Sequence, residues 1–171
     1  SFDKSVARER MPPQERDDTA ARLDFTTDLG DMADRQLVIE AVIEEETLKT
    51  EVFRTLDRVV ESPDAILASN TSSIPIMKLG IATQRPENVV GIHFFNPVPV
   101  LKLVELVTSL MTSTETIARA ESFAEDALTK IVIRSQDRAG FVVNALLIPY
   151  ILSAIRMMES GFATAVDIDN G

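Results

Sequence analysis

Apolar and polar residues follow two different periods along this chain of 171 residues. Short apolar runs rich in β-branched side chains predict strands. These runs lie at 23–27, 37–42, 65–68, 89–95, 100–107 and 131–133. Apolar residues spaced three or four positions apart instead predict helices at 48–60 and 117–128, with a shorter helix at 74–79. Strands that alternate with helices in this way are typical of an α/β sheet that is largely parallel but mixed.

Local start signals accompany two of these helices. The acidic run Glu44-Glu45-Glu46 precedes the helix at 48–60, where negative charge suits the positive end of the helix dipole. Thr112 and Glu115 fit a capping box before the helix at 117–128. We therefore expect Thr112 to cap that helix.

The first 22 residues do not follow the alternation of strands and helices. They are rich in charge and are interrupted by Pro12 and Pro13. This pattern predicts a helical hairpin exposed to solvent, with helices at 1–11 and 14–22.

A long apolar helix is predicted at 141–160. It is shorter than the roughly 20 residues that a membrane span needs, and Asn144 and Pro149 interrupt it. We expect it to be buried in a second domain or at a subunit interface.

Composition narrows the possible partners. The net charge of −10 argues against a nucleic-acid partner, because phosphate binding is driven by clusters of lysine and arginine. The chain has no cysteine, which excludes disulfides, thiol nucleophiles and zinc ribbons. No metal site is expected either, since the chain has one histidine and no H-E-x-x-H motif. No secretory signal opens the sequence, so we expect a soluble, cytoplasmic protein with no membrane partner.

Four polar residues within or beside apolar runs are candidates for chemistry. His93 is the single histidine and falls near the end of a predicted strand, and Ser72 follows the end of another. Glu105 lies inside an apolar strand, and Asn144 lies in the first turns of the apolar helix. Ligands of open α/β sheets bind beyond the carboxyl ends of the strands, so these side chains could meet in one crevice. Two readings of Glu105 stay open: a buried partner of His93, or a residue at a wet sheet edge.

Such a cluster would be a proton-transfer site. Glu105 would hold the imidazole of His93 while that ring moves a proton, and Ser72 and Asn144 would hydrogen-bond a substrate oxygen. A Ser-His-Glu hydrolase is disfavoured, because no G-x-S-x-G elbow surrounds any serine. The six glycines form no G-x-G-x-x-G loop, so composition by itself does not suggest a dinucleotide.

Four sequence blocks resemble those of the 3-hydroxyacyl-CoA dehydrogenases, most closely the monofunctional bacterial 3-hydroxybutyryl-CoA dehydrogenases. They are Ser69-Asn70-Thr71-Ser72-Ser73, His93-Phe94-Phe95-Asn96-Pro97-Val98-Pro99, Leu103-Val104-Glu105 and Gly140-Phe141-Val142-Val143-Asn144, in this order and spacing. The similarity extends over nearly the whole chain.

The resemblance implies NAD-dependent oxidation of a (S)-3-hydroxyacyl-CoA, or the reverse reduction of acetoacetyl-CoA. It assigns His93 as the catalytic base and Glu105 as the group that orients it. It places Ser72 and Asn144 on the substrate oxygen.

The resemblance also implies contacts with cofactor and substrate. The cofactor is NAD, with NADP left open, and its contacts carry over to Glu44, Lys49, Ser72 and Asn96. For the acyl-CoA, Ser1 aligns with a position that contacts coenzyme A, and Arg8 or Arg10 lies near its basic partner.

The ends depart from the family pattern. The family begins with a strand, a glycine-rich loop and a helix, and its C-terminal domain is a helical bundle that forms a homodimer. The expected fold is thus an incomplete Rossmann-like sheet at 1–137, with the hairpin at 1–22, followed at 138–171 by the first helix of an all-helical dimerisation domain. A second hypothesis is a non-catalytic structural relative, or an inactive fragment, of the same fold.

Overall fold

The computed structural model describes residues 2–171, so the predicted contact of Ser1 with coenzyme A lies outside the described residues. The chain forms two compact units, Ser1–Asp31 and Met32–Gly171. In the first unit, helices α1 (Phe2–Ala7) and α2 (Pro13–Ala20) confirm the two predicted helices but are shorter.

The strand predicted at 23–27 is wrong. These residues form no regular element, and Phe25 is 93% exposed. The apolar pattern there is short, and a strand is stable only when another strand pairs with it.

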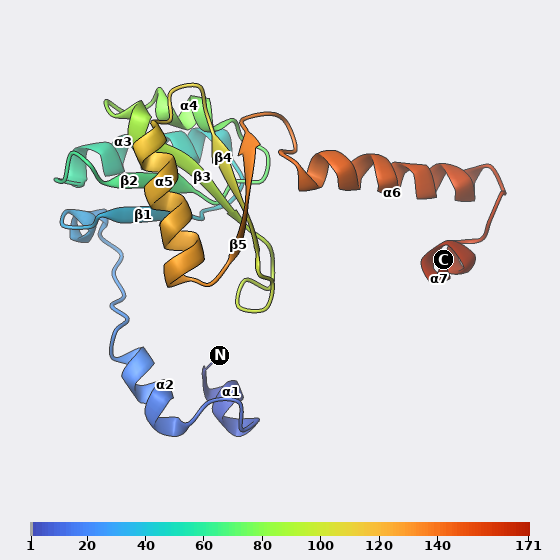
Figure 1. The fold of residues 1–171 in the computed structure, drawn as a ribbon, viewed down its shortest axis with the longest axis horizontal. Coiled ribbons are helices and arrows are strands. Elements are labelled where there is room, and N and C mark those ends of the chain that lie inside the picture. The colour runs from blue at the N-terminus through green and yellow to red at the C-terminus, as the bar shows by residue number, and fades with distance from the viewer. Residues whose placement is uncertain (1) are drawn as a thin grey trace. The chain divides into compact units, whose positions relative to one another are not determined.

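The second unit is built on a five-stranded sheet (Figure 1). Its strands are β1 (Leu37–Glu40), β2 (Ile66–Ser69), β3 (Val89–Phe94), β4 (Leu103–Thr108) and β5 (Ile131–Gln136). They lie side by side in sequence order, and only the β3–β4 pair is antiparallel. The prediction of a largely parallel but mixed sheet is confirmed.

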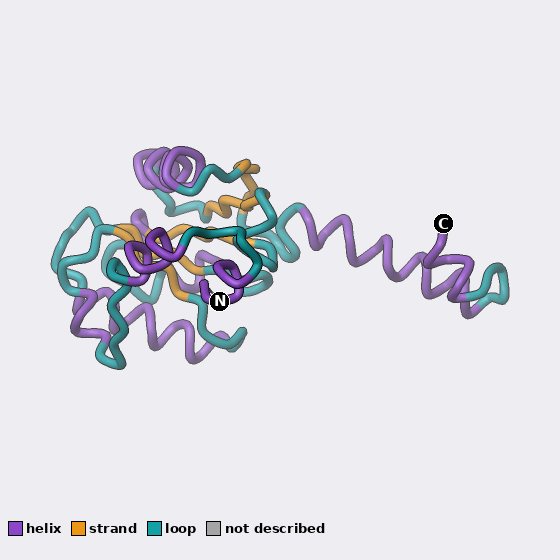
Figure 2. Tube along the Cα trace, turned by 90° about the horizontal axis from the view of Figure 1, so that it is seen from below, coloured by secondary structure: helices purple, strands orange, loops and turns teal. Residues whose placement is uncertain are grey.

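Helices cover both faces of this sheet (Figure 2). The remaining helices are α3 (Glu46–Val59), α4 (Ile76–Gly80), α5 (Thr114–Ser122), α6 (Val143–Glu159) and α7 (Ala165–Asn170), with 3₁₀ turns at Leu29–Met32 and Pro86–Asn88 and a π turn at Phe123–Ala127. One core layer joins the sheet to α3 and α4 through residues such as Phe53 and Ile76. The other layer includes Ala120 of α5.

The cap of α5 differs from the predicted one. The Oγ atom of Ser113 accepts a hydrogen bond from the Thr116 amide at 3.1 Å, so Ser113 is the N-cap. The Thr112 hydroxyl instead donates to the Val89 carbonyl at 2.8 Å, where β3 begins. The capping-box prediction for Thr112 is therefore wrong, because a contact with the sheet takes its hydroxyl.

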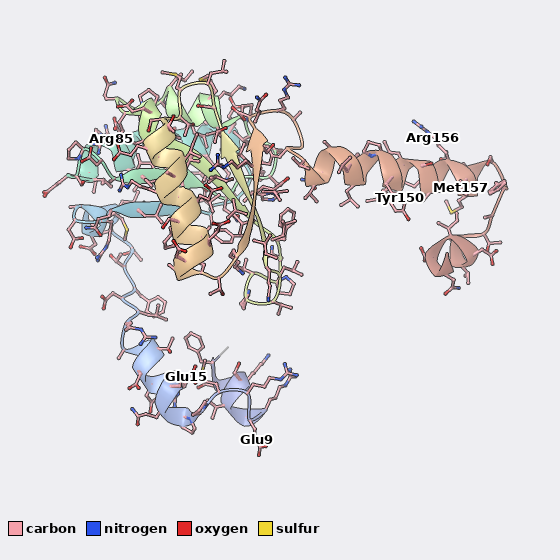
Figure 3. The ribbon with its side chains drawn as sticks, viewed as in Figure 1. Glu9, Glu15, Arg85, Tyr150, Arg156 and Met157 are labelled. Carbon is pink, nitrogen blue, oxygen red and sulfur yellow. The ribbon has the colours of Figure 1, made fainter. Side chains whose placement is uncertain are left out.

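Arg85 closes the C-terminal end of α3. Its guanidinium donates to the carbonyls of Asp57, Val60 and Ser62, and its Nε donates to the Asp57 carboxylate at 2.9 Å. The last carbonyls of a helix have no partner within the helix, and the planar fork of an arginine can satisfy several at once. Figure 3 labels Arg85.

A buried lysine ties β1 to α3. Lys49 is 1% exposed, and its ammonium contacts Glu40 at 2.7 Å, the Val42 carbonyl at 3.2 Å and Glu44 at 3.4 Å. An ammonium has three N–H donors. Two of them are used on Glu40 and the Val42 carbonyl, and Glu44 forms an ion pair with the same group. Glu40 also accepts a hydrogen bond from the Ser69 hydroxyl at 2.7 Å, which fixes the end of β2 to the same cluster.

Glu44 connects this cluster to the loop after β2. Its Oε1 atom accepts hydrogen bonds from the amides of Ser72 and Ser73 and from the hydroxyls of Thr71 and Ser73, at 2.5 to 3.1 Å. Burial acts to raise the pKa of Glu44, but these hydrogen bonds and the Lys49 charge outweigh it and lower that pKa from 4.5 to about 2. The charged form of Glu44 thus holds the Ser72 loop.

Helix α6 is exposed in this chain. None of its described residues is buried, and Tyr150, labelled in Figure 3, is 74% exposed. Its expected burial in a domain or interface stays a prediction. Among residues 2–171, no helix combines the length and apolar character that crossing a membrane requires.

Gly91 of β3 is tightly packed against its neighbours. A Cβ atom there would lie 2.8 Å from Val107 and 2.9 Å from Ile76, which are closer than real Cβ contacts. Gly91 therefore lets α4 lie directly on the strand that carries His93.

Gly91→Ala should lower the free energy of unfolding by about 1–3 kcal/mol, because overpacking of a filled core forces neighbours to move. Urea unfolding of the intact protein measures this. Gly80→Ala is the matched control, since its nearest neighbour would be 3.6 Å away. Equal stability of both variants would contradict the packing described.

Glu44→Gln should destabilise the protein at neutral pH and lose this effect in acid. A carboxyl whose pKa falls from 4.5 to about 2 on folding stabilises the fold above pH 4.5, and this contribution is lost as the pH falls toward 2. Because the side chain is 37% exposed, we expect a difference of only about 1–2 kcal/mol near pH 6. Urea unfolding at pH 6, 4 and 3 tests this, with Glu51→Gln on the exposed side of α3 as control.

Candidate active site

His93 and Glu105 face each other across two neighbouring strands. They are directly paired in the β3–β4 register, so their side chains leave the same face of the sheet. The Nδ1 atom of His93 lies 2.7 Å from Oε2 of Glu105. His93 is 7% exposed and Glu105 is fully buried. The reading of Glu105 as a residue at a wet edge is wrong.

The second oxygen of Glu105 is held by backbone. Its Oε1 atom accepts hydrogen bonds from the amides of Val142 at 2.9 Å and Val143 at 2.8 Å, at the start of α6. A buried carboxylate costs several kcal/mol unless hydrogen bonds or an opposite charge compensate it. Here both oxygens have hydrogen-bond partners, as a buried carboxylate requires.

The contact with the Glu105 carboxylate sets the tautomer of His93. A carboxylate only accepts hydrogen bonds, so the neutral imidazole carries its proton on Nδ1 and leaves Nε2 as an acceptor. Two aromatic rings surround the imidazole: Phe95, with ring centres 4.6 Å apart, and Phe141, at 5.7 Å and edge-on. This arrangement can accept a proton at Nε2.

Asn70 connects the strand that precedes Ser72 with the strand that carries His93. Its amide donates to the Glu40 carbonyl of β1 at 2.8 Å, while its side-chain oxygen accepts from the Phe94 amide of β3 at 2.8 Å. The loop with Ser72 therefore leaves the sheet at the same edge as His93. Asn70 belongs to the Ser69–Ser73 block, but no role is predicted for it from the sequence. Its position just after a buried strand is the only local signal for such a link.

The other predicted residues have different surroundings. Ser72 and Asn144 are half-buried, and no hydrogen bond within the described part of the chain joins their side chains to His93. Asn96 is exposed two residues after the end of β3, and its peptide bond to Pro97 is cis.

Four further predicted residues remain: two belong to the cluster around Lys49, and two lie in the first unit. Lys49 is enclosed by protein oxygens, and Glu44 is partly exposed at the loop that it holds. Arg8 and Arg10 are exposed and follow α1 in the first unit, Ser1–Asp31.

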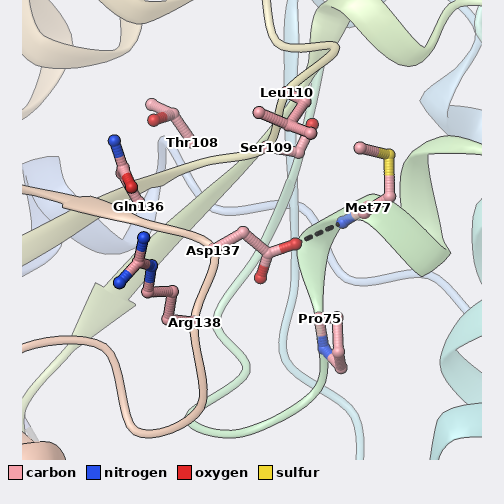
Figure 4. Close-up of a pocket in the computed structure, with 8 residues that line it drawn as sticks. All are labelled: Pro75, Met77, Thr108, Ser109, Leu110, Gln136, Asp137 and Arg138. Atoms are coloured by element: carbon pink, nitrogen blue, oxygen red, sulfur yellow. Dashed lines mark hydrogen bonds between the residues drawn. The ribbon is translucent and has the colours of Figure 1, made fainter.

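Asp137 fixes the connection from β5 toward α6. Its carboxylate accepts hydrogen bonds from the amides of Ile76 at 2.9 Å and Met77 at 2.8 Å, and Figure 4 shows the bond to Met77. A hollow of about 490 Å³ lies beside it, also lined by Arg138 and Ser109. None of the predicted site residues lines this hollow. The role of Asp137 is to fix the segment after β5 to the start of α4.

Comparison with known proteins identifies two family domains. Residues 1–138 match the NAD binding domain of 3-hydroxyacyl-CoA dehydrogenase, and residues 140–171 match the C-terminal domain of the same family. The blocks that carry the resemblance described above fall within these two ranges.

Individual relatives point to the same family as the domain matches. A 3-hydroxybutyryl-CoA dehydrogenase from Mycobacterium tuberculosis is 60% identical over 169 residues, which cover 99% of this chain and 59% of that protein. The crystal structure of M. tuberculosis FadB2 matches with a TM-score of 0.94 and 60% identity, covering 97% of this chain and 58% of the other. That of (S)-3-hydroxybutyryl-CoA dehydrogenase PaaH1 from Ralstonia eutropha matches with a TM-score of 0.92 and 37% identity, with the same coverage.

The chain thus spans less than two thirds of the length of these relatives, 59% for the M. tuberculosis dehydrogenase. The predicted Rossmann-like fold is confirmed by the sheet and by these matches. Because the family's NAD binding domain matches 1–138, most of the described sequence, the chain belongs to the 3-hydroxyacyl-CoA dehydrogenase family.

Proposed function

We propose that the intact protein oxidises the 3-hydroxyl group of an acyl-CoA with NAD, or reduces the 3-keto group in reverse. The observation that supports this most directly is the 2.7 Å contact between His93 and Glu105, which leaves Nε2 free to take a proton. The relatives named 3-hydroxybutyryl-CoA dehydrogenase make a short acyl-CoA the first substrate to test.

In the proposed reaction His93 is the base. Its Nε2 atom accepts the hydroxyl proton while the hydride on the same carbon leaves for the cofactor, so the C–O single bond becomes a carbonyl. The imidazolium formed is stabilised by Glu105, whose charge is held by the two backbone amides. Ser72 and Asn144 are proposed to hydrogen-bond the substrate oxygen.

The residues at this sheet edge suit a dinucleotide in part. NAD would supply the hydride acceptor. Glu44, Ser72 and Asn96 have polar atoms at or near the carboxyl ends of β1, β2 and β3, where cofactors of this fold bind. Lys49 differs, because its ammonium is enclosed by three protein oxygens. We propose that Lys49 affects the cofactor through Glu44.

The remaining assignments are proposals of the same kind. Ser1 and Arg8 would contact the coenzyme A part of the substrate. The boundary between the NAD-binding and helical domains would lie near 137–138. A cytoplasmic location and the lack of a nucleic-acid partner stay predictions.

We also propose a homodimer formed through the C-terminal helices. Large apolar side chains are exposed on α6 and after it, including Leu146 at 70%, Tyr150 at 74% and Phe162 at 75%. Exposed apolar surface of this extent marks sites of protein contact.

His93→Gln should lower kcat for NADH oxidation with acetoacetyl-CoA by about 10²–10⁴-fold, the usual contribution of a general acid or base. The KM values should change little, because the ring acts mainly in the transition state. Stopped-flow absorbance at 340 nm on the intact protein is a suitable measurement.

Arg54→Gln, on the exposed side of α3, serves as the control and should keep wild-type rates. Unchanged turnover in His93→Gln would reject the role of His93. A folded wild-type protein without activity would favour the non-catalytic relative.

For the dimer, sedimentation equilibrium of the intact protein should give twice the mass of one chain. Tyr150→Lys should shift this mass toward the monomer, because a buried unpaired charge destabilises an interface. Arg54→Gln should leave the mass unchanged. A monomeric wild type would contradict the proposed dimer.

A further inference from the structure

The turn before α6 has an unusual backbone. Gly140 has φ +77° and Phe141 has φ +49°, so two successive residues adopt the left-handed conformation. Glycine adopts it freely, whereas a bulky residue such as phenylalanine rarely does. A Cβ atom at Gly140 would in addition lie 3.0 Å from the Ala145 amide nitrogen. The surrounding structure must therefore hold Phe141 in this conformation.

The left-handed residue directs two amides to one point. Phe141 is followed by Val142 with φ −100° and ψ −55°, in the right-handed region. A left-handed residue next to a right-handed one turns successive amides inward to form a concave anion site. The amides of Val142 and Val143 here meet on the same oxygen of Glu105, at 2.9 and 2.8 Å.

Contacts on both sides keep the turn in place. Asp137 is bound to the start of α4, and the Phe141 amide donates to the Arg138 carbonyl at 2.9 Å. The Phe141 ring is 7% exposed, belongs to the core layer under α3 and α4, and meets the His93 ring edge-on. The ring thus anchors a backbone conformation that the residue alone would avoid.

We propose that Phe141 is a positioning residue for His93 and Glu105, acting through its left-handed backbone. With this backbone lost, Glu105 would lose two hydrogen bonds to one oxygen and could turn away from Nδ1 of His93. The imidazole would then populate the tautomer with its proton on Nε2, which cannot accept the substrate proton. The effect on turnover rests on the function proposed above, but the effect on the tautomer does not.

Two substitutions separate backbone from packing. Phe141→Gly and Phe141→Val both remove the ring. Glycine adopts the left-handed conformation readily, whereas valine, branched at Cβ, strongly avoids it. Valine retains more apolar surface, so a purely packing role predicts that Val is the better substitute. A backbone role predicts the opposite order.

We expect kcat of Phe141→Val to be at least about tenfold below that of Phe141→Gly, with KM values within about threefold of each other. ¹⁵N spectra of histidine-labelled protein should show Nδ1–H in wild type and Phe141→Gly, and more Nε2–H in Phe141→Val. The His93 signal is identified by its loss in His93→Gln. Valine equal to or better than glycine in both measurements would overturn the proposal.

Gly140→Ala provides a second test if Phe141→Gly does not fold. It leaves the Phe141 ring in place and strains only the turn, because of the positive φ and the close Ala145 amide. The proposal requires a rise in Nε2–H and a lower kcat, and an unchanged tautomer would overturn it. If wild type has no dehydrogenase activity, the proposed function fails while the tautomer measurements still decide the role of Phe141.

Discussion

The buried carboxylate of Glu105 is the interaction on which the site depends. One of its oxygens accepts a hydrogen bond from Nδ1–H of His93, and the other accepts hydrogen bonds from two backbone amides. An ion in a dry interior is tolerated only with such full compensation, and removing one partner leaves an unpaired charge. The same group therefore joins β3, β4 and the start of α6, and it gives the imidazole both a fixed orientation and a defined tautomer.

A second buried charge organises the neighbouring strands in a similar way. Lys49 of α3 holds Glu40 of β1, and Glu44 continues from it to the loop that carries Ser72. Asn70 then connects that loop to β3. Because β1, β2 and β3 are parallel, Ser72 and His93 lie at the carboxyl ends of the neighbouring strands β2 and β3.

Local periodicity predicted the sheet well because its cause is local. Buried strands such as β2 and β3 are continuous apolar runs, and α3 repeats its apolar face at helical spacing. Where the outcome depended on distant partners, prediction failed. The run at 23–27 has no strand to pair with, and Thr112 bonds to β3 instead of capping α5. Arg85, ordinary in sequence, closes a helix about 28 positions earlier.

The sequence by itself determined the fold class, the family and the candidates His93, Glu105 and Ser72, because motif spacing and hydrophobic pattern are written along the chain. Only the tertiary structure decided that Glu105 is buried, that Lys49 is enclosed and that Phe141 is left-handed. These features arise from contacts between segments such as β4 and the start of α6, 37 residues apart. Register and burial are properties of packed neighbours, and no local pattern specifies them.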